Sequence, residues 1–115
     1  MSVQIKRIYD EADPADGERI LVDRLWPRGL SKEKAPFDSW MKEVAPSAAL
    51  RKWFGHRPER WAEFQARYRE ELQGNPAVDA LRERIADGPV TLLYGARDRS
   101  INQAVVLAKF LTETS

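Results

Sequence analysis

Hydrophobic and polar residues alternate, or run together, in three short stretches that fit β-strands. Residues 3–9 alternate apolar and polar side chains, which predicts a half-buried strand at a sheet edge. Residues 20–25 open with an apolar run and end in charged and aromatic side chains. Residues 90–94 are apolar nearly throughout, which is typical of a strand buried on both faces.

Helical spacing replaces this pattern over most of the remaining chain, and it predicts five helices. The first lies between Pro36 and Pro46; later ones follow Ser47, Pro58 and Asn75, and the last follows Ser100 as its N-cap. Their expected apolar stripes are Phe37, Trp40, Met41 and Val44; Leu50, Trp53 and Phe54; Trp61, Phe64, Tyr68 and Leu72; Val78, Leu81 and Ile85; and Ile101, Ala104, Val105, Ala108 and Leu111.

The order of these elements predicts an α/β fold. The long helical connection between the second and third strands requires them to be parallel, with a right-handed crossover. The short connection after the first strand leaves that strand's direction open. We therefore expect one domain of residues 1–115, with a small, mainly parallel sheet of three or slightly more strands. About five helices should pack around the sheet and cover both of its faces.

Composition removes several classes of chemistry. The 115 residues include no Cys and one His, which excludes disulfides, thiolate zinc sites, Cys nucleophiles and multi-His metal sites. We therefore expect no metal and no cofactor. No apolar run approaches the roughly 20 residues of a membrane span, and the first residues lack the apolar core of a signal peptide. The expected location is the cytoplasm, away from membranes.

The cations are mostly arginine: 13 Arg stand against 6 Lys, with a net charge of +1. Arginine grips phosphates and carboxylates with two hydrogen bonds, so this bias favours an anionic partner. A genome rich in G and C would also raise the arginine content. The weak net charge argues against non-specific nucleic-acid binding.

Candidate site residues gather where the second and third strands end, because parallel strands bring their carboxyl ends to one edge of the sheet. The second strand is followed by Asp23, Arg24, Trp26 and Arg28. The third ends at Tyr94 and is followed by Arg97, Asp98 and Asn102, close to the start of the last helix. A helix N-terminus favours anions, so the sequence predicts a pocket for a small anionic ligand at this edge.

The possible roles divide by side-chain chemistry. Arg24, Arg28 and Arg97 would clamp the anion, with Trp26 and Asn102 beside it. If the protein is an enzyme, Asp23 or Asp98 would orient an arginine or act as a base, and His56 or Tyr94 would carry a proton. His56 is the one His and lies in a Gly-His-x-Pro turn between helices.

Structural roles compete with each of these. Asp23 could pair with Arg28 or Arg97, Asp98 could cap the last helix, and His56 could be an exposed turn residue. Glycine-rich phosphate loops and nucleophile elbows are absent from the sequence. An Arg- and Trp-rich face over residues 51–69 is an alternative nucleic-acid surface, although interleaved glutamates are typical of a solvated helix face. A partner-binding module without catalysis is a third alternative, and the oligomeric state stays open.

Several sequence segments of this chain resemble those of one known family. These are residues 6–10, 16–17, 21–32, 45–47, 50–56, 60–61 with Phe64 and Tyr68, and 90–94 with Asp98 and Asn102. Together they resemble the YeaO-like branch of domain-of-unknown-function family 488. Longer members of that family carry a Cys and a Cys-His-Arg motif around the last strand and helix. Residues 94–96 and 102–104 stand at those places here without Cys, so the resemblance implies no thiol chemistry.

Overall fold

The computed structural model describes residues 3–113 and has an α/β architecture with one parallel sheet. The strands are β1 (Val3–Arg7), β2 (Glu18–Leu21), β3 (Ser39–Trp40) and β4 (Val90–Tyr94). The α-helices are α1 (Ala48–Phe54), α2 (Trp61–Leu72), α3 (Pro76–Asp87) and α4 (Gln103–Glu113). Short 3-10 turns cover Pro14–Asp16, Lys32–Lys34, Lys42–Val44 and Pro58–Arg60.

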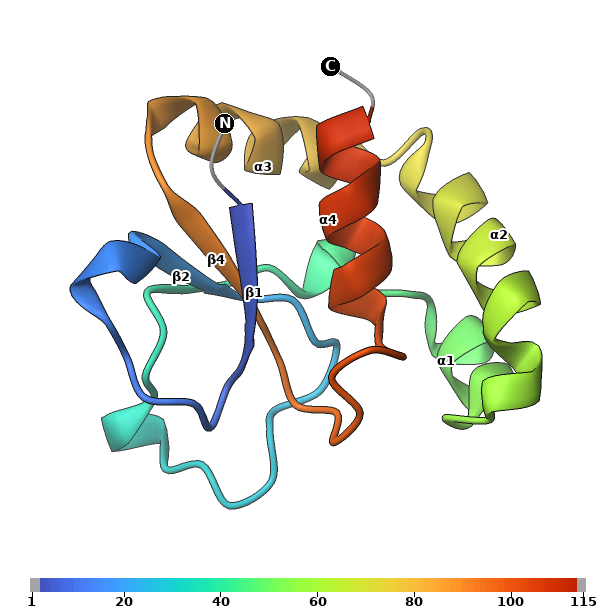
Figure 1. Cartoon of the computed structure of the whole chain (residues 1–115), viewed down its shortest axis with the longest axis horizontal. Coiled ribbons are helices and arrows are strands. Elements are labelled where there is room, and N and C mark those ends of the chain that lie inside the picture. Colours follow the sequence, from blue (N-terminus) through green and yellow to red (C-terminus); the bar gives the residue numbers. More distant parts are fainter. Residues whose placement is uncertain (1–2, 114–115) are drawn as a thin grey trace.

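The sheet has the strand order β1-β4-β2-β3, and each neighbouring pair is parallel. The expected parallel direction of β2 and β4 and the edge position of β1 are both confirmed, and β2 and β4 are neighbours in the sheet. The direction of β1, open from sequence, is parallel to β4. In Figure 1, β1 and β4 run away from α3, so the loops that follow them both lie in the lower half of the view.

The helix predicted between Pro36 and Pro46 is wrong. Ser39 and Trp40 instead form the edge strand β3, where the backbone N–H of Met41 donates to the carbonyl of Leu21 at 2.9 Å. Phe37 and Trp40 pack on one side of the sheet, whereas Met41 lies in the core on the other. Tertiary pairing overrides the apparent helical spacing, so the described chain has four α-helices rather than about five. Its four strands lie within the expected three or slightly more.

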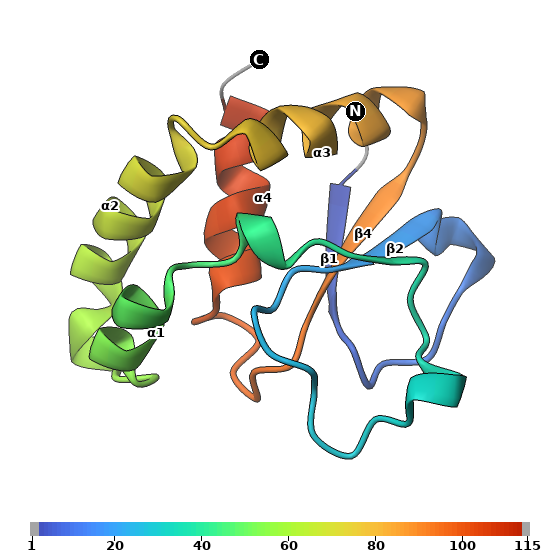
Figure 2. The same cartoon turned by 180° about the vertical axis from the view of Figure 1, so that it is seen from behind.

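The two faces of the sheet are covered differently. Buried residues of all four α-helices pack with Ile20, Val22, Leu92 and Tyr94 in the main core. Figure 2 shows the same layers from behind, with α1 and α2 on the side away from β2. The other face presents Ile8, Leu21 and Leu93, which pack against Leu30 and Phe37 of the β2–β3 connection and against Trp40 of β3. The expectation that helices cover both faces is therefore wrong, because an aromatic loop covers the second.

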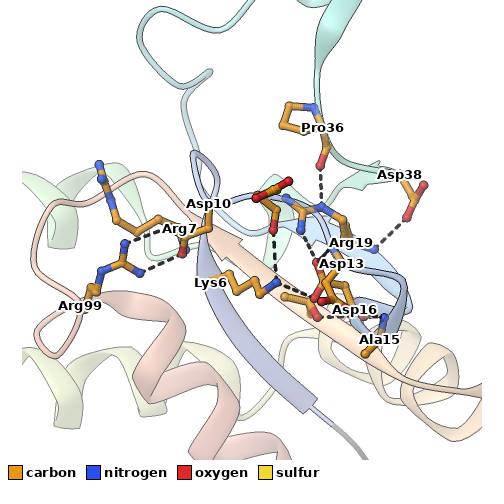
Figure 3. Close-up of polar contacts among 12 residues, drawn as sticks. Lys6, Arg7, Asp10, Asp13, Ala15, Asp16, Arg19, Pro36, Asp38 and Arg99 are labelled. Carbon is orange, nitrogen blue, oxygen red and sulfur yellow. Dashed lines mark hydrogen bonds and ion pairs between the residues drawn. The ribbon is translucent and has the colours of Figure 1, made fainter.

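A buried ion network joins β1, β2 and the turn between them. Asp16 is 2% exposed and accepts from Arg19 and from Lys6, whose Nζ lies 2.8 Å from it (Figure 3). The Nε of Arg19 donates to the Pro36 carbonyl at 2.8 Å, and its backbone N–H to Asp38 at 2.8 Å. These contacts fasten the approach to β3 onto β2.

The final helix begins later than expected. Asn102, rather than Ser100, is its N-cap, since the Asn102 side chain accepts from the backbone N–H of Val105 at 3.1 Å. Residues 98–102 form a separate turn in which Asp98 accepts from the N–H groups of Ser100 and Ile101 at 2.8 and 2.9 Å. The buried stripe of α4 is Ala104, Val106, Leu107, Phe110 and Leu111, so Val105 and Ala108 lie at its margin instead.

Candidate functional site

A cleft of about 810 Å³ opens at the carboxyl ends of β1, β2 and β4. Its walls come from the loops that follow these strands, from the end of α1 and from the start of α4. In an α/β sheet this edge is the usual place for a ligand. The cleft is large enough for a ligand the size of a typical cofactor fragment or metabolite.

Eight of the nine residues predicted from sequence line this cleft. They are Asp23, Arg24, Trp26 and Arg28 after β2, His56 after α1, and Arg97, Asp98 and Asn102 after β4. The fold therefore brings together segments that lie more than 70 residues apart, and the two carboxylates of Asp23 and Asp98 share one cavity.

Tyr94 lies elsewhere. Its side chain is 2% exposed and packs in the main core beneath the helices, because it alternates with Leu93 along β4. Burial also raises the pKa of the Tyr94 hydroxyl above its usual value. A proton carrier at neutral pH needs the opposite shift and access to the cleft, so the structure gives Tyr94 a packing role.

Asp23 is held at the junction of β2, β4 and α4. Its Oδ2 accepts from the backbone N–H of Gly95 at 2.9 Å, and its Oδ1 accepts from the side-chain amide of Gln103. A Cβ on Gly95 would lie 2.8 Å from the Asp23 Oδ2, so this approach requires glycine. Desolvation raises the pKa of Asp23 to about 6, outweighing the two hydrogen bonds and the nearby charge of His56, which lower it.

Two tryptophans stiffen the loop that carries Asp23. The indole Nε1 of Trp40 donates to the Asp23 carbonyl at 2.6 Å, and that of Trp26 to the Leu30 carbonyl at 2.8 Å. The ring of Trp26 meets those of Trp40 and Phe37 edge-on, each with centroids 5.6 Å apart. Trp26 therefore forms a rigid wall of the cleft.

The arginines of the cleft fall into two groups. Arg24 donates through Nε to the Pro46 carbonyl at 2.8 Å and through Nη2 to the Ala45 carbonyl at 3.3 Å. Arg7 donates to the carbonyls of Ala96 at 2.9 Å and Gly95 at 3.3 Å. These two guanidinium groups hold backbone segments of the wall in place.

The second group consists of Arg28, Arg51 and Arg97. Their side chains are exposed and line the cleft. Within residues 3–113, none of the three makes a side-chain hydrogen bond, ion pair or ring contact. Their hydrogen-bond donors are therefore available to a bound anion.

The β4–α4 loop is fixed from the outside by an ion pair. Both terminal nitrogens of Arg99 donate to the Asp10 carboxylate at 2.8 Å (Figure 3), and Asp10 also accepts from the Arg7 N–H at 2.9 Å. These bonds lower the pKa of Asp10 to about 2. Within the loop, the side-chain amide of Asn102 donates to the Asp98 carbonyl at 2.9 Å.

His56 occupies a strained turn at the mouth of the cleft. Its φ is 56°, in the left-handed region that non-glycine residues rarely adopt, and it follows Gly55 at φ 53°. Its positive charge lowers the pKa of both Asp23 and Asp98. His56 therefore lies close enough to act electrostatically on both carboxylates.

The lining residues with polar side chains that were missed from the sequence are Arg7, Tyr9, Arg51 and Gln103. Arg7 and Tyr9 would have followed from the parallel direction of β1, since they stand at its carboxyl end. Gln103 is the first residue of α4, and the misplaced N-cap at Ser100 concealed its position.

Two arginines of the alternative face over residues 51–69 are engaged internally, whereas Arg51 lines the cleft without a side-chain partner within residues 3–113. The guanidinium groups of Arg60 and Arg67 lie 5.0 and 4.5 Å from the ring centroid of Trp53. Arg60 also donates to the Trp53 carbonyl, and Arg67 pairs with Glu63. These cations are thus already engaged within the protein.

Residues 3–113 contain neither a candidate membrane-spanning helix nor a candidate metal site. No helix in this part of the chain is long and apolar enough to cross a bilayer. No three His, Asp or Glu side chains there come close enough together to hold a metal ion.

Comparison with known proteins places the chain in a family. The family model described as the inactive DUF488-N3 subclade matches residues 2–115. The uncharacterized protein YeaO of Escherichia coli K12 is 43% identical over 116 residues, covering 96% of this chain and 97% of YeaO. The uncharacterized protein Rv3073c of Mycobacterium tuberculosis H37Rv is 43% identical over 109 residues, covering 95% and 92%. Comparison with solved structures gave no match.

The coverage is nearly complete in both directions, and the matched region contains every residue of the cleft. The chain belongs to the YeaO-like DUF488 family, within its inactive DUF488-N3 subclade.

Proposed function

We propose that this protein binds a small anionic ligand, bearing a phosphate or carboxylate group, in the cleft at the carboxyl ends of its strands. One observation carries the proposal. Arg28 and Arg97 reach the same cleft from the loops after β2 and β4, and neither has a side-chain partner within residues 3–113. Two such guanidinium groups can hold one anion through charge-assisted hydrogen bonds.

The surroundings support an anion at this place. Gln103 and Asn102 bring the start of α4 to the cleft, and the first N–H groups of a helix lack intrahelical acceptors. Phe54, Phe64 and Pro27 contribute apolar wall, which strengthens electrostatic contacts by excluding water.

The remaining residues have supporting roles in the proposal. Arg7 and Arg24 position the walls through backbone carbonyls. Asp98 shapes the loop that carries Arg97, through its contacts with Ser100 and Ile101. When His56 is protonated, it adds a positive charge at the mouth of the cleft.

We propose ligand binding rather than turnover. The family's own description as inactive favours binding, as does a core position for Tyr94. In this proposal Asp23 acts as a hydrogen-bond acceptor and not as a catalytic base.

Isothermal titration calorimetry with inorganic phosphate at constant ionic strength tests the proposal. The wild-type protein should bind phosphate at one site. Arg28→Ala and Arg97→Ala should each weaken binding about 10- to 100-fold, since hydrogen bonds to charged groups contribute about 1.5–3 kcal/mol. Lys109→Ala removes the same charge from an exposed position on α4 outside the cleft and should bind as the wild type does.

If all three variants lose the same phosphate affinity, the effect is one of net charge alone. That result would contradict a site at the two arginines. Absence of saturable phosphate binding by the wild type, repeated with acetate as a carboxylate probe, would overturn the proposal as a whole.

A further inference from the structure

Exposed apolar side chains gather at the anion cleft. Among the described residues, the large hydrophobic side chains with high exposure are Tyr9, at 45%, and Leu25, at 57%. Both line the cleft. Scattered exposure of this kind is ordinary, but its concentration beside unpartnered arginines is informative about what the cleft accommodates.

The Tyr9 ring is held in its exposed position. Its hydroxyl donates to the Arg28 carbonyl at 2.7 Å, and the Arg7 guanidinium lies 4.9 Å from the ring centroid. Arg7 is itself fixed by the carbonyls of Gly95 and Ala96. An aromatic ring immobilised in this way can stack against a planar ligand with little further loss of side-chain entropy.

Contacts lead directly from this ring to a half-buried acceptor, the Asp23 carboxylate. Arg7 donates to the Gly95 carbonyl, and the Gly95 N–H donates to the Asp23 carboxylate. Tyr9, Arg7, Gly95 and Asp23 therefore lie side by side along one wall. The Asp23 oxygens receive two hydrogen bonds, while a carboxylate offers about four acceptor sites, so capacity remains for a donor from a ligand.

Arg28 completes the arrangement, because the Tyr9 hydroxyl bonds to its backbone while its side chain remains unpartnered within residues 3–113. A free phosphate or acetate would use the arginines alone. It would leave most of the roughly 810 Å³ cleft, its aromatic wall and the Asp23 acceptor unused. The combination fits a larger molecule that carries an anion at one end and a planar ring with an N–H donor at the other.

We propose that the ligand is a nucleoside monophosphate. Its phosphate meets Arg28 and Arg97, its base stacks on Tyr9, and an N–H group of the base donates to Asp23. This inference rests on the proposed function, since it places the same anion at the same two arginines.

Calorimetric titrations with AMP, GMP, CMP and UMP, compared with ribose 5-phosphate, test it. Ribose 5-phosphate carries the same phosphate and sugar without a base. At least one nucleotide should bind 10-fold or more tightly than ribose 5-phosphate. Asp23→Asn should reduce that preference to under threefold without weakening ribose 5-phosphate binding. Asp79→Asn, an exposed change on α3 outside the cleft, should leave the preference intact.

Substitutions of Tyr9 provide a second, independent test of the nucleotide proposal. Tyr9→Phe keeps the ring and should keep the nucleotide preference, whereas Tyr9→Leu should lose about 5- to 10-fold of it, as expected for base–aromatic stacking. Thermal unfolding of each variant confirms that the fold is retained.

The outcomes separate the two proposals. If the nucleotides and ribose 5-phosphate bind equally, the nucleotide assignment is overturned and the anion site stands. A preference that survives both Asp23→Asn and Tyr9→Leu also overturns the assignment. If none of the five compounds binds, both this inference and the proposed function are contradicted.

Discussion

The carboxylate of Asp23 accepts a hydrogen bond from the backbone N–H of Gly95 at 2.9 Å, which joins the loops after β2 and β4 at the floor of the cleft. The contact is possible because Gly95 has no side chain: a Cβ would lie 2.8 Å from the Asp23 Oδ2. The carboxylate whose pKa is raised by burial is thus positioned by a close approach to the Gly95 backbone.

Gly95→Ala should therefore disturb the cleft. We expect a loss of about 1–3 kcal/mol in the free energy of unfolding, typical of overpacking, together with weaker phosphate binding. Urea denaturation and calorimetry measure the two effects. Gly74→Ala is the matched control, because nothing lies within 4 Å of its Cβ position. Equal behaviour of the two variants would contradict the close approach.

Asp23 should also control stability between pH 4 and pH 7. Its pKa is raised from 3.8 to about 6, so the folded state favours the protonated carboxyl. Its contribution to stability is fully present below pH 3.8 and is lost as the pH rises through about 6. The difference corresponds to about 3 kcal/mol.

Asp23→Asn should flatten this part of the pH profile and should be more stable than the wild type at pH 7. The amide can keep its contact with Gln103 if the Gln103 amide rotates by half a turn. Chemical denaturation at pH 4, 5, 6 and 7 measures the profile. An unchanged slope in the variant would show that another group is responsible.

The buried Asp16 network should dominate the stability of the β1–β2 region. Asp16→Ala leaves Arg19, which is 6% exposed, without its carboxylate, and should cost about 3–5 kcal/mol. Asp13→Ala removes an exposed cap of the same turn and should cost about 1 kcal/mol or less. Urea denaturation compares them, and similar losses for both would refute the assigned role of Asp16.

His56 should be a site of local strain. Because its φ is 56°, His56→Gly should be more stable than His56→Ala by about 1 kcal/mol, since alanine keeps the left-handed penalty and glycine does not. Both variants lack the imidazole and should bind phosphate equally. Equal stability of the two variants would be inconsistent with strain at this position.

Much of the candidate site could be predicted because it depends on topology. The crossover rule brings the ends of β2 and β4 to one edge, and this alone placed residues as distant as Asp23 and Asp98 in one cleft. Side-chain direction was harder to predict. Tyr94 follows the alternation of β4 into the core, and Arg24 turns to the carbonyls of residues 45–46.

The local structure was predicted wrongly where pairing between residues distant in the sequence determines it. Residues 37–44 carry helical spacing, yet Trp40 pairs with Leu21 in the sheet and its indole bonds to the Asp23 carbonyl. Neither interaction leaves a local signal in the sequence. Gln103 was missed for a related reason, since the capping residue of α4 depends on a turn closed by Asp98.

Backbone amide chemical shifts during a titration with inorganic phosphate test the central claim most directly. The account predicts saturable shifts concentrated at residues 24–28, 95–98 and 102–105, with the same dissociation constant, and their loss in an Arg28→Ala/Arg97→Ala double variant. Shifts that do not saturate, or that center on the α1–α2 surface around Ser47 and Arg67, would contradict an anion site at the strand ends.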